Sequence, residues 1–169
     1  MVVKDVGRVG VYSCEHLYAR MCERANPTTG PVLTELAGSG VYLPPVRKFS
    51  TVEQAQTYAS SVIVSTRNLW PNMAGVKVRE RKGDRAAHWE APNTIAVPTT
   101  MLDEHVLLHE LAHHVSFHNG TGGQKAHGKE FRTTLCTLHT TAIGPVGGWA
   151  LSVVFDMFLP PENFREEGK

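Results

Sequence analysis

The segment 107–118, LLHELAHHVSFH, carries the residues best suited to chemistry. Its apolar residues recur at helical spacing, so His109 and His113, four residues apart, lie on one face of a helix and can bind one metal ion. Glu110 points about 100° away on the helical wheel, which suits a base acting on a metal-bound water better than a ligand. The H-E-x-x-H pattern therefore predicts a metal site with its own general base.

A catalytic zinc ion usually has three protein ligands and one open position, so a third ligand is expected from another element. The glycine-rich segment 119–126 can reverse the chain, and His127-Gly128 then opens a second expected helix over 129–142. We expect His127 to be the third ligand of a single zinc ion, because Gly128 permits close approach. Glu130 is the alternative, since a carboxylate completes many H-E-x-x-H sites.

The other histidines are not expected to bind the metal. His114 follows the second ligand and points about 100° away, and His118 lies near the helix end, so both are expected to face solvent or to cap the helix. His105 lies one turn before the first ligand and is expected to support a ligand or to be exposed. No role is assigned to His16 or His139.

Helical periodicity and end signals predict the helices that must hold these side chains. Thr100 and Asp103 resemble a capping box at the start of the motif helix, and Asn119-Gly120 is a typical exit. The glycine-containing stretch 144–148 is expected to interrupt helical structure before a last apolar helix. The expected helices cover residues 9–25, 51–69, 101–118, 129–142 and 149–159.

Short alternating runs predict a small, mainly antiparallel sheet between these helices. The expected strands cover residues 76–81, 86–90 and 94–97. Residues 28–45, rich in Gly, Pro, Thr and Ser, are expected to form a long loop that could overhang the site. N-terminal helices, a small sheet, the motif helix and a closing helix together predict an α+β domain with a zincin-like layout.

Several motifs resemble known families. The run HELAHH, a glycine-rich connection and then AHGKEF resemble the HExxH…HGxxF arrangement of SprT-like zinc metalloproteases and their minigluzincin relatives, which implies His127 as a ligand. With FSTVEQAQTYASSV, VRERKGDRAAHW and TIAVP ahead of them, residues 5–142 are similar to a family of HExxH metallohydrolases from mycobacteria, other actinobacteria and their phages. The resemblance implies a zincin-like fold, and it implies Thr94–Val97 as the edge strand that would hold an extended peptide.

Hydrolysis is the reaction that this ligand set predicts. Three neutral imidazoles leave the charge of zinc undiminished, which lowers the pKa of its bound water, and Glu110 can take a proton as that water attacks a carbonyl group. The developing oxyanion needs a donor besides the metal, for which the candidates are His88, Arg85 and Tyr42. His88 has the best claim, because it precedes the strand implied as the edge, although an ordinary surface histidine is the plainer interpretation.

Length and composition limit the classes of protein to which this chain can belong. The chain has 169 residues, 41% of them hydrophobic, which predicts one domain over 1–159 and a disordered tail over 160–169. A net charge of +1 gives no support for nucleic-acid binding by bulk charge. Three cysteines without a C-x-x-C pair favour a reducing cytoplasm. No leader-like apolar run is visible, and the run 149–159 is about half of a bilayer span, so a soluble protein is expected.

Three classes of function fit these observations. The first is a zinc-dependent peptidase or related amide hydrolase that acts on a peptide or protein with Glu110 as its base. The second is a non-catalytic binding module in which zinc joins two helices, and Glu110 argues against it because a structural site needs no base. The third is a DNA-associated or regulatory SprT-like protease. For nucleic acid the sequence offers only the basic run 79–85, which fits a solvated hairpin better.

Overall fold

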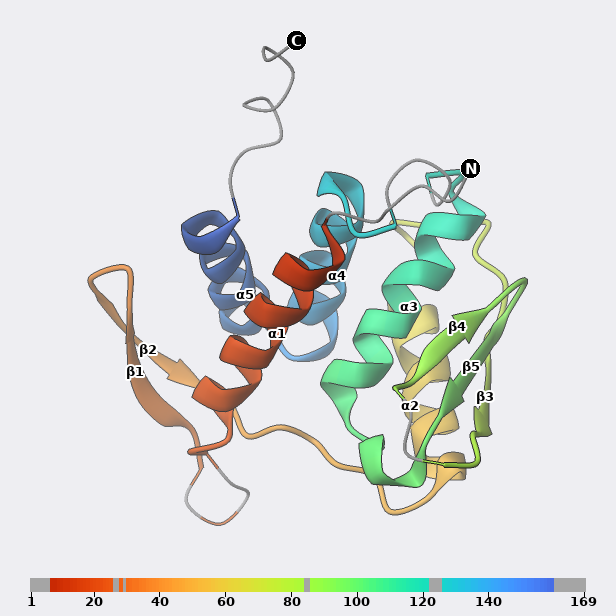
Figure 1. The fold of residues 1–169 in the computed structure, drawn as a ribbon, viewed down its shortest axis with the longest axis horizontal. Helices are drawn as coiled ribbons and strands as arrows, with labels where there is room; N and C mark the ends of the chain where they lie inside the picture. Colours follow the sequence, from red (N-terminus) through yellow and green to blue (C-terminus); the bar gives the residue numbers. More distant parts are fainter. Residues whose placement is uncertain (1–6, 26–27, 29, 84–85, 122–125, 160–169) are drawn as a thin grey trace, which may run out of the picture.

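The computed structural model describes residues 7–25, 28, 30–83, 86–121 and 126–159. Within these ranges five α-helices and two small sheets form the expected α+β class of fold (Figure 1). The predicted tail 160–169, the oxyanion candidate Arg85 and part of the glycine-rich connection, 122–125, lie outside the described residues. The elements are α1 (Arg8–Cys22), β1 (Val32–Leu36), β2 (Ser39–Leu43), α2 (Val52–Ser65), β3 (Lys77–Glu80), β4 (His88–Glu90), β5 (Thr94–Val97), η1 (Thr99–Met101), α3 (Glu104–His118), α4 (Lys129–Ala142) and α5 (Pro145–Phe158).

Helix α3 lies in the middle of the molecule, with the sheet and α2 on one side and α1, α4 and α5 on the other (Figure 1). It carries apolar residues around most of its circumference, and a helix with that pattern is buried on several sides. Leu107, Leu108 and Leu111 are fully buried there. The helix with the H-E-x-x-H motif is therefore the central element of the fold.

The start of α3 differs from the expected capping box. Asp103 is itself the N-cap, because its side chain accepts a hydrogen bond of 3.0 Å from the backbone N–H of Val106. Thr100 instead belongs to the short 3-10 helix η1, which ends before the cap. The helix thus begins at Glu104 rather than at Met101.

Helix α2 follows its predicted pattern. Thr51 is the N-cap, and its hydroxyl accepts a hydrogen bond from the backbone N–H of Gln54. The expected apolar stripe is confirmed, although the helix ends at Ser65 rather than at Leu69. The buried residues of the stripe are Ala55, Tyr58, Ala59, Val62 and Ile63.

The three-stranded sheet has the order β3-β5-β4, with β5 parallel to β3 and antiparallel to β4. The expectation that Thr94–Val97 is an edge strand is therefore wrong, because these residues form the central strand. Its residues Ile95, Ala96 and Val97 are all fully buried, and a strand that is covered on both faces belongs inside a sheet. The edge strand that contacts α3 is β4.

Residues 28–45 do not form a long loop, which corrects a second expectation. Strands β1 and β2 pair there as an antiparallel hairpin that stands beside α1 and α5 (Figure 1). The two turn residues, Ala37 and Gly38, have φ values of 50° and 76°, as a type I′ turn requires. The Gly and Pro residues around these two strands made the alternating pattern of their side chains hard to recognise in the sequence.

The last two helices pack closely against each other. Helix α4 has the predicted bounds, but the chain breaks only at Gly144, whose φ is 121°, and α5 already begins at Pro145. Gly148 lies inside α5, where an added Cβ would come within 2.6 Å of the Cys136 carbonyl oxygen on α4. Gly147 and Gly148 therefore permit close packing inside a helix, whereas Gly144 separates α4 from α5. Among the described residues, no helix is both long and apolar enough to cross a membrane.

Candidate metal centre

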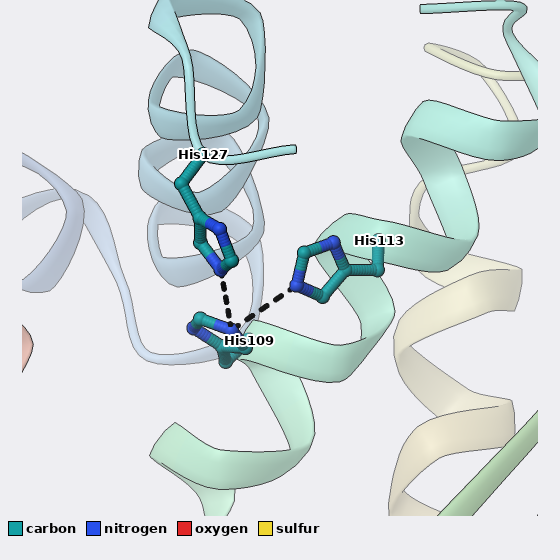
Figure 2. A group of neighbouring side chains, drawn as sticks. All are labelled: His109, His113 and His127. Carbon is teal, nitrogen blue, oxygen red and sulfur yellow. Dashed lines mark hydrogen bonds between the residues drawn. The ribbon is translucent and has the colours of Figure 1, made fainter. Parts of the chain in front are cut away.

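Three histidines, His109, His113 and His127, converge on one point (Figure 2). The Nε2 atom of His109 lies 3.2 Å from Nε2 of His113 and 3.3 Å from Nε2 of His127. One ligand atom from each residue falls within 4.8 Å of the others, and the described residues contain one group of this kind. The structure thus brings together the three expected ligands in an arrangement that could hold a metal ion.

The two helices that carry these histidines explain the convergence. His109 and His113 come from successive turns of α3, and His127 comes from the residues just before α4 (Figure 2). Phe131, in the first turn of α4, packs against all three rings with centroid distances of 4.6–5.0 Å. Glu130, the alternative third ligand, is exposed and is not part of the group.

Glu15 of α1 contacts the outer nitrogen of His109, and the sequence interpretation missed it. Both carboxylate oxygens lie 2.9 Å from Nδ1 of His109, so Nδ1–H donates to Glu15 and Nε2 presents its lone pair to the cluster. Burial works to lower the pKa of His109, but the Glu15 carboxylate outweighs it and the net pKa is raised. Glu15 therefore fixes both the orientation and the tautomer of this imidazole.

Glu110 lies buried between the cluster and the edge strand β4. Helix α3 contacts β4, and the backbone of Trp89 on that strand acts to lower the pKa of Glu110. Burial raises the pKa of Glu110, and the charge on Glu15 raises it further, against the opposing effect of His109. A carboxylate with a raised pKa accepts a proton more readily than a solvated one, which suits a general base.

Tyr12 of α1 covers the cluster on the side opposite the sheet. Its ring centroid lies 4.8 Å from the ring of His109 and 5.5 Å from the ring of His127. The guanidinium of Arg8 lies 5.5 Å from the Tyr12 ring centroid, and its charge acts to lower the pKa of the phenol. Burial raises the pKa of Tyr12, and the Glu110 carboxylate raises it further, so the phenol keeps its proton at neutral pH.

An open groove with a volume of about 1140 Å³ runs between α1 and α3. Tyr12 and Glu15 line one wall, and His109 and Glu110 line the other. Through His109 the cluster borders a space large enough for an extended ligand, and the carboxylate of Glu110 and the phenol of Tyr12 line the same space.

Of the three candidates for an oxyanion donor, Arg85 lies outside the described residues, and His88 and Tyr42 do not line the groove. His88 is on β4, where its Nδ1 contacts Arg81 at 2.7 Å and its Nε2 contacts Glu90 at 2.9 Å. It is near enough to Glu110 to lower the pKa of that carboxyl slightly, but it does not line the groove. Tyr42 is 64% exposed on the hairpin, and it does not line the groove either.

Among the histidines outside the cluster, His114 and His139 are buried, and His105 and His118 are partly buried. His114 is fully buried, and its Nε2 lies 2.9 Å from the Ala74 carbonyl oxygen, so the expectation that it faces solvent is wrong. His118 contacts the Pro92 carbonyl oxygen at 3.1 Å. His105 and His139 pack around Tyr18, with ring centroids 5.1–5.7 Å apart, and burial lowers the pKa of His139 to about 3. None of these four belongs to the metal-binding group.

Comparisons of the chain with protein-family models, with curated proteins and with solved structures gave no match. The chemistry of the centre therefore has to be argued from its own residues and geometry.

Proposed function

We propose that the protein is a zinc-dependent metallohydrolase with a zincin-like fold, and specifically a metallopeptidase that acts on peptide or protein substrates. The observation that carries the proposal is the convergence of three imidazole nitrogens beside a buried glutamate at the wall of an open groove. The resemblance of the HELAHH and AHGKEF motifs to SprT-like metalloproteases supports the same conclusion.

Zinc suits the donor set. In a tetrahedral site with Zn–N bonds of about 2.0–2.1 Å, two ligand nitrogens are separated by about 3.3 Å. The separations of the His109 Nε2 atom from those of His113 and His127, 3.2 Å and 3.3 Å, agree with that value, and the ligand atoms of all three residues lie within 4.8 Å of one another. Three imidazoles without a fourth protein ligand are typical of catalytic zinc sites, which keep one position open.

The roles of the chain's own residues follow from their positions. His109, His113 and His127 would hold the metal, and a bound zinc ion would supply Lewis-acid activation of water and of a carbonyl group. Glu110 would take the proton that the attacking water loses when its oxygen bonds to the carbonyl carbon. When the C–N bond breaks, Glu110 would return that proton to the leaving nitrogen, so the two products carry all the atoms of water and amide.

Strand β4 is where we place the extended substrate. Strands at the end of a sheet pair readily with added peptides, and β4 is the end strand that contacts α3. The backbone of Trp89 on this strand is close enough to Glu110 to lower the pKa of that carboxyl group. A peptide that runs along β4 would therefore pass directly beside the base.

A non-catalytic zinc module fits these features less well. Structural zinc sites usually have four protein ligands and are closed to solvent. The described residues offer three ligands, and the cluster borders a groove. A structural role also leaves the buried carboxylate of Glu110 without a purpose.

Association with nucleic acid draws little support from the basic run 79–85. Arg79 pairs with Glu90, and Arg81 donates to the Ala86 carbonyl oxygen and contacts His88. These two guanidinium groups therefore bind within the sheet instead of forming an exposed basic patch. We propose a peptide or protein substrate without a nucleic-acid partner.

Glu110→Gln tests the proposed function. The substitution keeps the size of the side chain and removes the proton acceptor, so hydrolysis of fluorescein-labelled casein should fall by about 100-fold to 10,000-fold. Zinc content and melting temperature should stay near those of the parent. Glu130→Gln is the matched control, because Glu130 is exposed outside the cluster, and it should hydrolyse casein at the parental rate. If Glu110→Gln were as active as the parent, the proposed base and mechanism would be wrong.

A further inference from the structure

Helix α1 presents three polar side chains to the groove from one face. Arg8, Tyr12 and Glu15 are spaced i, i+4 and i+7, so they lie within about 60° of one another around the helix. All three line the groove that also contains His109 and Glu110. This face of α1 is therefore part of the site, although it is far from the H-E-x-x-H motif in sequence.

Tyr12 lines the groove and lies over the cluster. The ring packs against the imidazoles of His109 and His127, which fixes the side chain over the cluster. The Arg8 guanidinium lies on the same ring, 5.5 Å from its centroid. Tyr12 is 37% exposed, and a ligand in the groove can reach it.

The proposed reaction requires a hydrogen-bond donor at this position. During amide hydrolysis the carbonyl oxygen gains negative charge, and a preorganised donor aimed at that oxygen is usually one of the largest contributions to catalysis. Glu110 is an acceptor, both ring nitrogens of His88 are engaged by Arg81 and Glu90, and Tyr42 does not line the groove. Tyr12 is a neutral hydroxyl donor that lines the groove and whose ring packs on two of the three histidines.

We propose that Tyr12 is a catalytic residue whose hydroxyl donates a hydrogen bond to the substrate carbonyl oxygen as that oxygen gains negative charge. The inference rests on the proposed function and adds the donor that the motif itself does not contain. It also sets the direction of the substrate: the carbonyl oxygen points toward α1, and the attacking water lies on the side of Glu110 and β4.

Tyr12→Phe tests the role of the hydroxyl, because it keeps the ring that packs on the histidines. The kcat for casein or a peptide substrate should fall by about 100-fold, with KM changed by less than about threefold. Zinc content should stay the same. Tyr42→Phe is the matched control on the exposed hairpin and should leave kcat unchanged. A purely structural tyrosine would tolerate Phe, so a parental kcat in Tyr12→Phe would overturn the proposal.

A second measurement does not depend on turnover. In the cobalt-substituted protein, acetohydroxamate binding can be followed by the visible absorption of the metal, and its oxygen should accept a hydrogen bond from Tyr12. We expect Tyr12→Phe to weaken binding by about tenfold, the equivalent of one hydrogen bond. Equal affinity in the two proteins would contradict the proposal.

The two proposals fail differently in these experiments. Parental hydrolysis by Glu110→Gln would refute the metallohydrolase mechanism and the role of Tyr12 with it. Loss of hydrolysis in Glu110→Gln, together with unchanged kcat and acetohydroxamate affinity in Tyr12→Phe, would refute only the role of Tyr12.

Discussion

Glu15 contacts the first histidine of the cluster across 94 residues of sequence. A carboxylate in that place orients the ligand imidazole and increases its basicity, and loss of such a partner typically costs 10-fold to 100-fold in metal affinity. The contact is buried, so water does not replace it easily. The residue is therefore expected to matter for metal binding without binding the metal itself.

Glu15→Gln should weaken zinc binding by about 10-fold to 100-fold, because the neutral amide no longer stabilises the charge that builds on His109. Competition with a chromophoric chelator measures this affinity. Glu23→Gln, on the same wall of the groove but without a ligand contact, is the matched control and should bind zinc like the parent. An unchanged zinc affinity in Glu15→Gln would show that the contact does not support the metal site.

Only part of this site could be predicted from the sequence. The spacing of His109, Glu110 and His113 fixes their relation because one helix carries all three. The role of His127 as a ligand was predicted from the glycine beside it and from the motif resemblance. Tyr12 and Glu15 could not be predicted, because their contacts depend on how α1 docks against α3, and no local pattern encodes that docking. The one sequence feature related to this docking is that Tyr12 and Glu15 share a helical face with Arg8.

At the scale of elements, prediction succeeded where a local signal was complete. Helices α2 and α4 have a clear apolar stripe, and α4 has its predicted bounds. It failed where a strand depends on a partner: β5 is central because two other strands enclose it, and β1 with β2 forms a hairpin through pairing that composition obscured. The glycines at 147–148 were also wrongly predicted to interrupt a helix. Their presence is explained by close tertiary packing and not by low helix propensity.

Gly148→Ala should destabilise the protein by about 1–3 kcal/mol, because the new methyl group would meet the Cys136 carbonyl oxygen at 2.6 Å and the hydroxyl of Thr140 still closer. Urea unfolding measures the change in the free energy of unfolding. Gly75→Ala is the control, since nothing lies within 4 Å of its Cβ position and the substitution should be nearly neutral. Equal stability of the two variants would mean that α4 and α5 are less closely packed than described.

On the scale of the whole molecule, the centre is assembled from three helices that are separate in the chain. Helix α3 supplies two histidines and the glutamate, the start of α4 adjoins the third histidine, and α1 supplies the carboxylate and the phenol. The edge strand β4 closes the site beside Glu110. The resulting groove is open along one side, as a hydrolase that accepts an extended chain requires.

X-ray absorption at the zinc edge, on protein loaded with one equivalent of zinc, tests the central claim most directly. We predict three imidazole nitrogens at about 2.0–2.1 Å and one further light-atom ligand at the open position. His127→Ala should lose one imidazole from that set, whereas Glu130→Gln should give the parental spectrum. A spectrum with sulfur ligands, with fewer than three imidazoles, or with zinc bound equally well after His127→Ala would contradict the proposed metal centre.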